Sequence, residues 1–354
     1  MQKNIVAEPQ LAGQGKQKIE WVKRNMPILR QIEDDFRKHQ YFSGLRVLVC
    51  IHLEAKTAYL AQVFAAGGAE VAVTGSNSHS TKDDVVAALA EEGMHVYARY
   101  GATPEEMRQY MNQALDVRPN IMIDDGGDIA ELVHTERQEL LPEVLGACEE
   151  TTTGVLRAKA RAKAGVLEFP VVLINDARCK YLFDNYHGTG QSVWDGVMRT
   201  TNLVVSGKTV VIIGYGWCGK GCAERAQGLG ANVIVCEVDP IKAADALMHG
   251  LRVMPLNQAV PEGDIILTVT GGKHVIRQEH YERMKDGVIL ANAGHFKIEF
   301  DLDALLNLSV EQKEMRHNIT GFLMADGRWL NLLGDGDLVN IACADGHQIG
   351  RAHV

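Results

Sequence analysis

Apolar residues in the first half of the chain come in short runs separated by longer amphipathic stretches. Short runs rich in Val, Ile and Leu are typical of buried parallel strands, and amphipathic stretches with apolar residues three and four positions apart are typical of helices. Strands are expected at residues 45–51, 70–74, 95–98, 121–123 and 170–174. Helices are expected at residues 15–40, 57–66, 82–92 and 104–115.

The same alternation begins again near Val210. The predicted strands of this second series are 209–213, 232–236, 252–254, 264–269 and 287–291, and residues 184–206 predict a helix that serves as a hinge. Strands that alternate with helices predict α/β domains with doubly wound parallel sheets. We therefore expect two Rossmann-like domains, a substrate-binding domain over residues 1–185 and a dinucleotide-binding domain over residues 190–340.

Composition and charge exclude several classes of protein. The net charge of −9 argues against a nucleic-acid or membrane-surface protein, which would carry a basic patch. No apolar run approaches the roughly 18 residues of a membrane span, and the first residues do not resemble a signal peptide. The seven cysteines are scattered and form no C-x-x-C pair, so neither a disulfide framework nor a metal site is expected. The predicted location is the cytoplasm.

A glycine turn follows the predicted strand 209–213. Gly214, Gly216 and Gly219 have the G-x-G-x-x-G spacing and precede a predicted helix, which is the context of a dinucleotide fingerprint. Glu237 ends the next strand, where a carboxylate can accept hydrogen bonds from both hydroxyls of an adenosine ribose. The same carboxylate would repel a 2′-phosphate, so NAD is preferred to NADP. A solvated acid at a strand end is the ordinary alternative.

Polar side chains also follow the predicted strands of the first half, where ligands of α/β sheets bind. His52 follows the first strand, Asp124 and Asp125 follow 121–123, and Lys180 and Asp184 have helical i,i+4 spacing. Each has an ordinary alternative: a structural histidine, a solvated turn and a surface ion pair. Further groups of this kind are Glu149–Gly154, whose Thr151 could be a helix N-cap, and Asn292–His295 in the second half.

These motifs occur together in an order that resembles the adenosylhomocysteinase family, the NAD-containing S-adenosylhomocysteine hydrolases. They are Asp-Asp-Gly-Gly-Asp at 124–128, Glu-Glu-Thr-Thr-Thr-Gly at 149–154, Phe-Asp-Asn at 183–185, the glycine turn, Gly-His-Phe at 294–296, and Leu-Val-Asn at 338–340 followed by Gly-His at 346–347. The resemblance runs from about residue 15 to His347. It implies reversible hydrolysis to adenosine and homocysteine, in which tightly bound NAD oxidises ribose C3′, elimination and water addition follow, and the hydride returns.

The resemblance also implies roles for individual residues. Lys180, assisted by Asp184, would deprotonate the 3′-hydroxyl, and a lysine whose pKa is lowered by its surroundings could do so near neutral pH. Asp125 and His52 would handle protons at C4′ and at the 5′ leaving group, with their division of labour open. The remaining implied site residues are Glu150 at the ribose 2′-hydroxyl, His295 at the 3′-oxygen and nicotinamide, His347 near the adenine edge, and Thr151, Thr152, Thr153, Asn185, Gly214, Gly216, Gly219, Glu237, Thr270 and Asn340 at NAD.

The chain departs from the common family pattern at the residues implied to meet the purine. The common eukaryotic form is His-Met-Thr-x-Glu-Thr, whereas this chain has His-Leu-Glu-Ala-Lys-Thr from His52 to Thr57. Lys56 can only donate, which suits a 6-oxo purine, while Glu54 could accept from the amino group of adenine. Adenine and hypoxanthine are both open, so an S-inosylhomocysteine hydrolase is the alternative. Lys242, where many members have asparagine, is a smaller departure.

The end of the chain is the second departure. Residues 348–354, Gln-Ile-Gly-Arg-Ala-His-Val, look like a translated sequencing adapter, and we expect them to be a non-native tail on a truncated chain. The resemblance implies that residues after about 340 complete the substrate domain and that the full-length protein is a homotetramer. A plain NAD-dependent dehydrogenase leaves Glu149–Gly154 and Asp124–Asp128 unexplained. An inactive or regulatory paralogue would have lost acid–base residues that this chain keeps.

Overall fold

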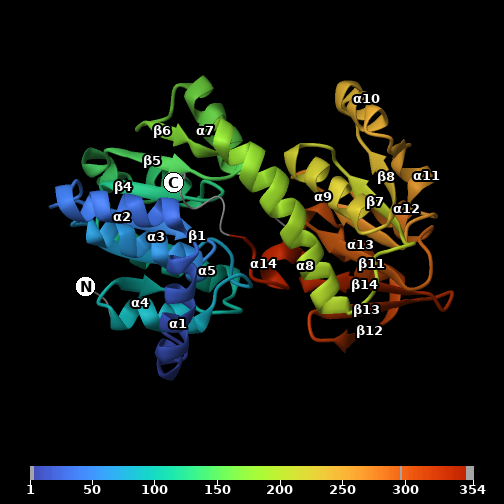
Figure 1. The fold of residues 1–354 in the computed structure, drawn as a ribbon, viewed down its shortest axis with the longest axis horizontal. Helices are drawn as coiled ribbons and strands as arrows, with labels where there is room; N and C mark the ends of the chain where they lie inside the picture. Colours follow the sequence, from blue (N-terminus) through green and yellow to red (C-terminus); the bar gives the residue numbers. More distant parts are fainter. Residues whose placement is uncertain (1–3, 296, 348–354) are drawn as a thin grey trace. The chain divides into compact units, whose positions relative to one another are not determined.

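The computed structural model of the protein describes residues 4–347 apart from residue 296. The chain divides into two compact units (Figure 1). The first unit comprises the described residues up to Lys180, and the second comprises Tyr181–His347. No helix among the described residues has the length and apolar character that crossing a membrane requires.

The first unit is built on a six-stranded parallel sheet. Its strands are β1 (Arg46–Ile51), β2 (Glu70–Gly75), β3 (His95–Tyr97), β4 (Ile121–Asp124), β5 (Gly146–Glu149) and β6 (Val171–Leu173). They pair in the order β3-β2-β1-β4-β5-β6, which is the doubly wound order with its reversal between β1 and β4. The predicted fold class is confirmed for this unit, although β5 was not predicted.

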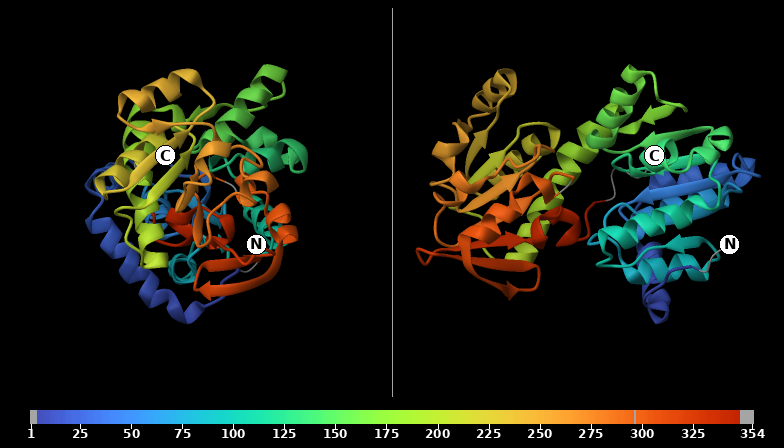
Figure 2. Two further views of the ribbon diagram at one scale, coloured as in Figure 1. Left: turned by 90° about the vertical axis from the view of Figure 1, so that its right-hand side faces the viewer. Right: turned by 180° about the vertical axis from the view of Figure 1, so that it is seen from behind.

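Helices cover both faces of this sheet (Figure 2). They are α1 (Ala12–Arg24), α2 (Pro27–His39), α3 (Ala55–Ala66), α4 (Asp83–Glu91), α5 (Pro104–Leu115), α6 (Asp128–Thr135) and α7 (Thr152–Ala164), with 3₁₀ turns η1 (Pro9–Leu11), η2 (Gln138–Glu143) and η3 (Ile174–Asp176). The core on one face comes from α1 to α4 and that on the other from α5 and α6. The single helix predicted over 15–40 is wrong, because Pro27 starts a new helix and Met26 before it is not helical.

The second unit contains an eight-stranded sheet in the order β12-β13-β14-β11-β10-β7-β8-β9. The strands are β7 (Thr209–Ile213), β8 (Asn232–Cys236), β9 (Arg252–Val253), β10 (Ile265–Thr268), β11 (Val288–Asn292), β12 (Ser309–Arg316), β13 (Ile319–Met324) and β14 (Trp329–Leu333). Six of these strands, in the spatial order β9-β8-β7-β10-β11-β14, repeat the doubly wound topology. The order reverses between β7 and β10. Strands β13 and β12 extend the edge in antiparallel fashion, and β12, β13 and β14 were not predicted.

The helices of the second unit pack on both faces of this sheet. They are α8 (Gly190–Thr201), α9 (Trp217–Gly228), α10 (Pro240–Met248), α11 (Leu256–Ala259), α12 (Gln278–Tyr281), α13 (Leu302–Leu308) and α14 (Val339–Ala342), with short turns η5 (Lys297–Glu299) and η6 (Gly334–Gly336). The predicted hinge helix begins earlier than expected, as the π-helix η4 (Lys180–Thr189), and continues as α8. A π-wound segment is rare and often marks a functional site.

Candidate active site

Most of the predicted site residues lie in segments that follow strands of the two sheets, and they divide between the two units. In the first unit these are His52, Glu54, Lys56, Thr57, Asp125, Glu150, Thr151, Thr152, Thr153 and Lys180. In the second unit they are Asp184, Asn185, Gly214, Gly216, Gly219, Glu237, Thr270, His295, Asn340 and His347. In the first sheet His52 follows β1 and Asp125 follows β4, so the two residues flank the point where the strand order reverses.

His52 and Asp125 form a buried pair. Nε2 of His52 lies 3.4 Å from Oδ2 of Asp125, and its Nδ1 lies 2.7 Å from Oγ of Ser80. The hydroxyl of Ser76 donates to Asp125 Oδ2 at 3.0 Å. Both serines lie in the loop after β2, and sequence reasoning missed them although the polar run from Ser76 to Thr81 follows a strand. The imidazole is therefore held between a hydroxyl and a carboxylate, an arrangement suited to proton transfer.

Two acids hold the backbone next to Asp125 and Glu150. They are Asp124 and Glu149, which directly precede those residues in the chain. Asp124 Oδ1 accepts from the Asp125 N–H at 3.0 Å, and its Oδ2 accepts from the Ala130 N–H at 2.9 Å. Glu149 Oε1 accepts from the N–H groups of Gly126 and Thr151 at 3.0 and 2.9 Å. Both acids are buried. Asp124 and Glu149 therefore fix the chain directions of Asp125 and Glu150.

Lys180 is buried and held by a short relay of side chains. Its Nζ donates to Asn175 Oδ1 at 3.1 Å, and Asn175 Nδ2 donates to Thr152 Oγ1 at 2.9 Å. Asn175 follows β6 and was not predicted as a site residue, although its position after a strand could have indicated it. Thr151 occupies the N-cap position of α7 without a capping side-chain bond among the described residues. The relay fixes the Lys180 ammonium group at the start of the π-helix.

Glu54 and Lys56 form a buried ion pair at the start of α3. Lys56 Nζ lies 2.6 Å from Glu54 Oε2. The same carboxylate caps α3 by accepting from the N–H groups of Lys56 and Thr57 at 3.0 and 3.3 Å. The Thr57 hydroxyl donates to the His52 carbonyl at 2.5 Å. Both oxygens of Glu54 accept hydrogen bonds at the start of α3, and the role of Glu54 as an acceptor for adenine stays a prediction.

The glycine turn of the second unit has the features of a dinucleotide site. Gly214 has a φ of +101°, and an added Cβ on Gly219 would overlap the Gly214 carbonyl oxygen, so both positions require glycine. An added Cβ on Gly216 meets no atom within 4 Å in the described part of the chain. Gly216 is the N-cap of α9, whose N-terminal N–H groups and dipole attract a phosphate. The turn therefore leaves space where a pyrophosphate would approach the backbone.

Three further second-unit residues fit NAD. Glu237 Oε2 accepts from the Tyr215 N–H at 2.7 Å, so the carboxylate is fixed beside the glycine turn. Asn185 Nδ2 donates to Cys218 Sγ at 3.3 Å, in the first turn of α9. Asn340 is buried, and its Oδ1 has no hydrogen-bond partner within residues 4–295 and 297–347. A buried amide oxygen without a partner is costly, and a ligand donor would satisfy it. The residues present fit NAD.

His347 and Asp184 lie together in the second unit. His347 Nδ1 is 4.0 Å from Asp184 Oδ2, and its Nε2 is 3.5 Å from Thr189 Oγ1. The imidazole packs against Gly188, where an added Cβ would overlap the ring. The structure therefore places the His347 side chain against the π-helix, and its implied role at the adenine edge stays a prediction.

Glu299 is a buried residue that sequence reasoning missed. Its carboxylate accepts from the Thr270 hydroxyl at 2.8 Å and from the Gly271 N–H at 2.7 Å, and an added Cβ on Gly294 would overlap it. Burial raises the pKa of Glu299. It thus joins the loop after β10, which carries Thr270, to the loop after β11, which carries His295. In the sequence Glu299 lies between the charged residues Lys297 and Asp301, and nothing there distinguishes it from an acid in a solvated turn.

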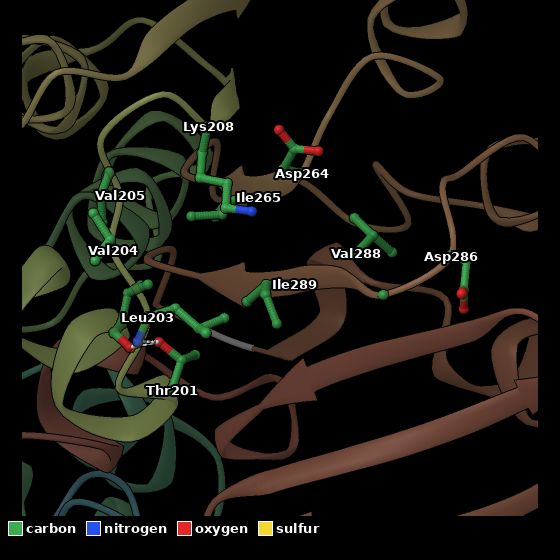
Figure 3. Close-up of a pocket in the computed structure, with 12 residues that line it drawn as sticks. Thr201, Leu203, Val204, Val205, Lys208, Asp264, Ile265, Asp286, Val288 and Ile289 are labelled. Atoms are coloured by element: carbon green, nitrogen blue, oxygen red, sulfur yellow. Dashed lines mark hydrogen bonds between the residues drawn. The ribbon is translucent and has the colours of Figure 1, made fainter.

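A cavity of about 270 Å³ lies at the other end of the second sheet (Figure 3). It is bordered by residues that precede β7, β10 and β11, among them Lys208, Asp264 and Asp286, and has an apolar floor that includes Ile265 and Ile289. None of the predicted site residues lines it. Because ligands of doubly wound sheets bind at the carboxyl ends of the strands, this cavity is not the cofactor site.

Known proteins resemble the chain over most of its length. The family model described as S-adenosyl-L-homocysteine hydrolase matches residues 3–141, and that described as S-adenosyl-L-homocysteine hydrolase, NAD binding domain, matches residues 185–346. The adenosylhomocysteinase of Thermococcus kodakarensis is 56% identical over 97% of this chain and 81% of its own length. The S-inosyl-L-homocysteine hydrolase of Methanopyrus kandleri is 53% identical over 97% of this chain and 81% of its own length.

A solved structure is more distantly similar. A dipicolinate synthase polypeptide from Bacillus halodurans is 13% identical, with a TM-score of 0.46 over 74% of this chain and 86% of that chain. That likeness is too weak to bear on the site.

Proposed function

Because the chain belongs to the S-adenosyl-L-homocysteine hydrolase family, we propose that it catalyses the reversible hydrolysis of S-adenosyl-L-homocysteine to adenosine and L-homocysteine. The observation that carries the proposal is the buried contact between His52 and Asp125 at the reversal point of the first sheet. A plain dehydrogenase would leave the polar groups Asp124–Asp128 and Glu149–Gly154 unexplained. The proposal includes a tightly held NAD and, for the full-length protein, a homotetramer in the cytoplasm.

The second unit would hold NAD through residues from several of its loops. The glycine turn and the N-terminus of α9 would take the pyrophosphate, Glu237 the adenosine ribose, and Asn340 a polar group of the cofactor. When bound, NAD⁺ would accept a hydride from ribose C3′ and return it at the end of the cycle, and the C4′ proton is acidic while C3′ is a ketone.

The first unit would supply the proton transfers. Lys180, held by Asn175, would take the proton of the 3′-hydroxyl. The His52–Asp125 pair would remove the C4′ proton and protonate the leaving homocysteine sulfur at C5′, and in the next step it would activate the incoming water. Glu150, at the end of β5, would accept a hydrogen bond from the 2′-hydroxyl.

The Asp125→Asn variant separates these steps. Asparagine cannot take a proton, so exchange of the C4′ hydrogen of adenosine with solvent should fall by about 10²-fold or more. The 3′-oxidation, read as absorbance of reduced nicotinamide when adenosine is added, should persist. Asp34→Asn on the exposed face of α2 is the matched control and should change neither signal. Loss of both signals in Asp125→Asn, with the fold intact, would contradict the assignment.

A second candidate substrate is S-inosyl-L-homocysteine, and the Glu54–Lys56 pair favours it. Both Glu54 oxygens already accept hydrogen bonds, while an ammonium group such as that of Lys56 only donates. A donor at the purine edge suits the 6-oxo group of hypoxanthine better than the 6-amino group of adenine.

The base preference can be measured with the two thioethers. If Lys56 donates to the purine, kcat/KM for the inosyl thioether should exceed that for the adenosyl thioether by about tenfold, which corresponds to roughly 1.4 kcal/mol. Lys56→Met should remove most of this difference, because methionine keeps the length of the side chain without a donor. A strong adenosyl preference in the unmodified chain would remove the second candidate.

A further inference from the structure

Asp124 and Glu149 are neighbouring buried acids that the proposed reaction does not use. They are register partners on the adjacent parallel strands β4 and β5, which brings their Cα atoms to within about 5 Å of one another. Asp124 is 1% exposed and Glu149 is 2% exposed. Burial raises the pKa of both carboxyl groups, and the charge of Asp124 adds to the rise at Glu149. Two full negative charges side by side in such a place would repel each other strongly.

The surroundings do not compensate two charges. Arg157 on α7 lines the small cavity beside the pair, but its Nη1 donates to Asp128 and to the Gly126 carbonyl, both at 2.7 Å. Asp125 and Asp128 add negative charge, and the buried Cys50 thiol faces the pair from β1 with a pKa raised by burial and by these acids. Arg161 on α7 is paired with Glu131 on α6.

Water has little room to compensate them. The cavity beside the pair, which both acids and Arg157 line, has a volume of about 20 Å³. A cavity of this size holds about one water molecule.

The hydrogen bonds distinguish the two acids. Each Asp124 oxygen accepts from a backbone N–H, of Asp125 and of Ala130, so a proton on either oxygen would weaken one of these bonds. At Glu149 both backbone donors, from Gly126 and Thr151, converge on Oε1. The carboxyl group also packs against Gly154, where an added Cβ would overlap it. Glu149 Oε2 is therefore the oxygen that can carry a proton while all four backbone bonds persist.

We propose that Glu149 is a positioning residue that keeps its proton at neutral pH, forms a carboxyl pair with ionised Asp124, and in this form holds Asp125 and Glu150 in place. The proposal rests on the proposed function only for the roles of Asp125 and Glu150. Protonation of Glu149 is measurable without any substrate.

The pH dependence of stability tests it. The unfolded chain releases the Glu149 proton near the ordinary value of 4.5, whereas the folded protein keeps it to higher pH. Above pH 4.5 the folded state thus binds more protons, so its stability falls as pH rises toward the raised pKa. Glutamine mimics the protonated acid and has no proton to lose. The stability of Glu149→Gln relative to wild type should therefore increase with pH. The ratio of the two equilibrium constants for unfolding should change by up to tenfold per pH unit.

Infrared spectra of the wild-type protein in heavy water are the second measurement. At neutral pH a protonated buried carboxyl gives a C=O band separate from those of carboxylates and amides, and Glu149→Gln should lose part of that band. Glu105→Gln on exposed α5 is the control and should change neither readout. In turnover, Glu149→Gln should retain kcat within about threefold at neutral pH and decline less at alkaline pH, while Glu149→Ala should lose kcat.

Two results would overturn the proposal. One is a pH-independent stability difference between wild type and Glu149→Gln together with an unchanged infrared band. The other is failure of Glu149→Gln to fold, because an isostere of the protonated acid must fold as the wild type does. If instead both physical readouts behave as expected and no variant, wild type included, turns over substrate, the proposed function fails while the protonation of Glu149 stands.

Discussion

Lys180→Met should lower kcat for thioether hydrolysis by about 10³-fold, within the range that a positioned acid–base group contributes. The lysine is buried and its Nζ donates to Asn175, which is itself held by Thr152. Methionine fills a similar volume but cannot take the proton of a 3′-hydroxyl. The reduced-nicotinamide absorbance that follows addition of adenosine should be lost as well, because oxidation at C3′ requires that proton to leave.

The fold of the Lys180→Met variant should persist. The substitution removes the ammonium group that donates to Asn175 Oδ1, so we expect a loss of about 1–3 kcal/mol in the free energy of unfolding, which the fold should tolerate. Lys163→Met, at an exposed position on α7, is the matched control and should keep wild-type kcat. NAD binding should also be retained in Lys180→Met, which would separate a chemical loss from a loss of cofactor. Retention of kcat within tenfold of wild type would show that Lys180 is not the base.

Substitutions in the glycine turn should separate folding from cofactor binding. In Gly219→Ala the new methyl group overlaps the Gly214 carbonyl oxygen, so we expect a loss of about 3 kcal/mol or more in the free energy of unfolding and no measurable NAD binding. In Gly216→Ala the methyl group meets no described atom within 4 Å, so the protein should fold. Its NAD affinity should nevertheless fall by about 100-fold, because the methyl group enters the space of the pyrophosphate.

Gly228→Ala is the matched control for both variants. It lies at the last position of the same helix, and an added Cβ there also meets no described atom within 4 Å. It should leave NAD affinity unchanged and alter stability by less than about 1 kcal/mol. Thermal unfolding and NAD titration of the three variants give the comparison. Wild-type NAD affinity in Gly216→Ala would contradict the placement of the pyrophosphate.

Most of the parallel strands and the glycine turn could be predicted because their signals are local. The apolar runs at Val210 and Ile265 are typical of strands buried on both faces, and the spacing of Gly214, Gly216 and Gly219 is a backbone requirement that only glycine meets. The polar residues after strands, such as His52 and Asp125, were located by the same reasoning, since strand ends of a parallel sheet share one edge.

Elements that depend on distant partners could not be predicted. Strand β12 is an exposed and mostly polar run from Ser309 to Arg316, which becomes a strand only by pairing with β13. Strand β5 contains Gly146 and Glu149 and has no β-branched residue, so it carries no strand signal of its own. Glu299 was missed for a similar reason, because its burial follows from two loops that meet in space.

Thioether synthesis by the purified chain without added NAD tests the central claim most directly. Homocysteine and either adenosine or inosine would be supplied, and product would be followed together with reduced-nicotinamide absorbance. Our account predicts many turnovers of thioether per protein molecule with no net accumulation of reduced nicotinamide, because the same bound cofactor is oxidant and reductant in each cycle. No thioether, or reduced nicotinamide formed in proportion to substrate only when NAD is added, would contradict it.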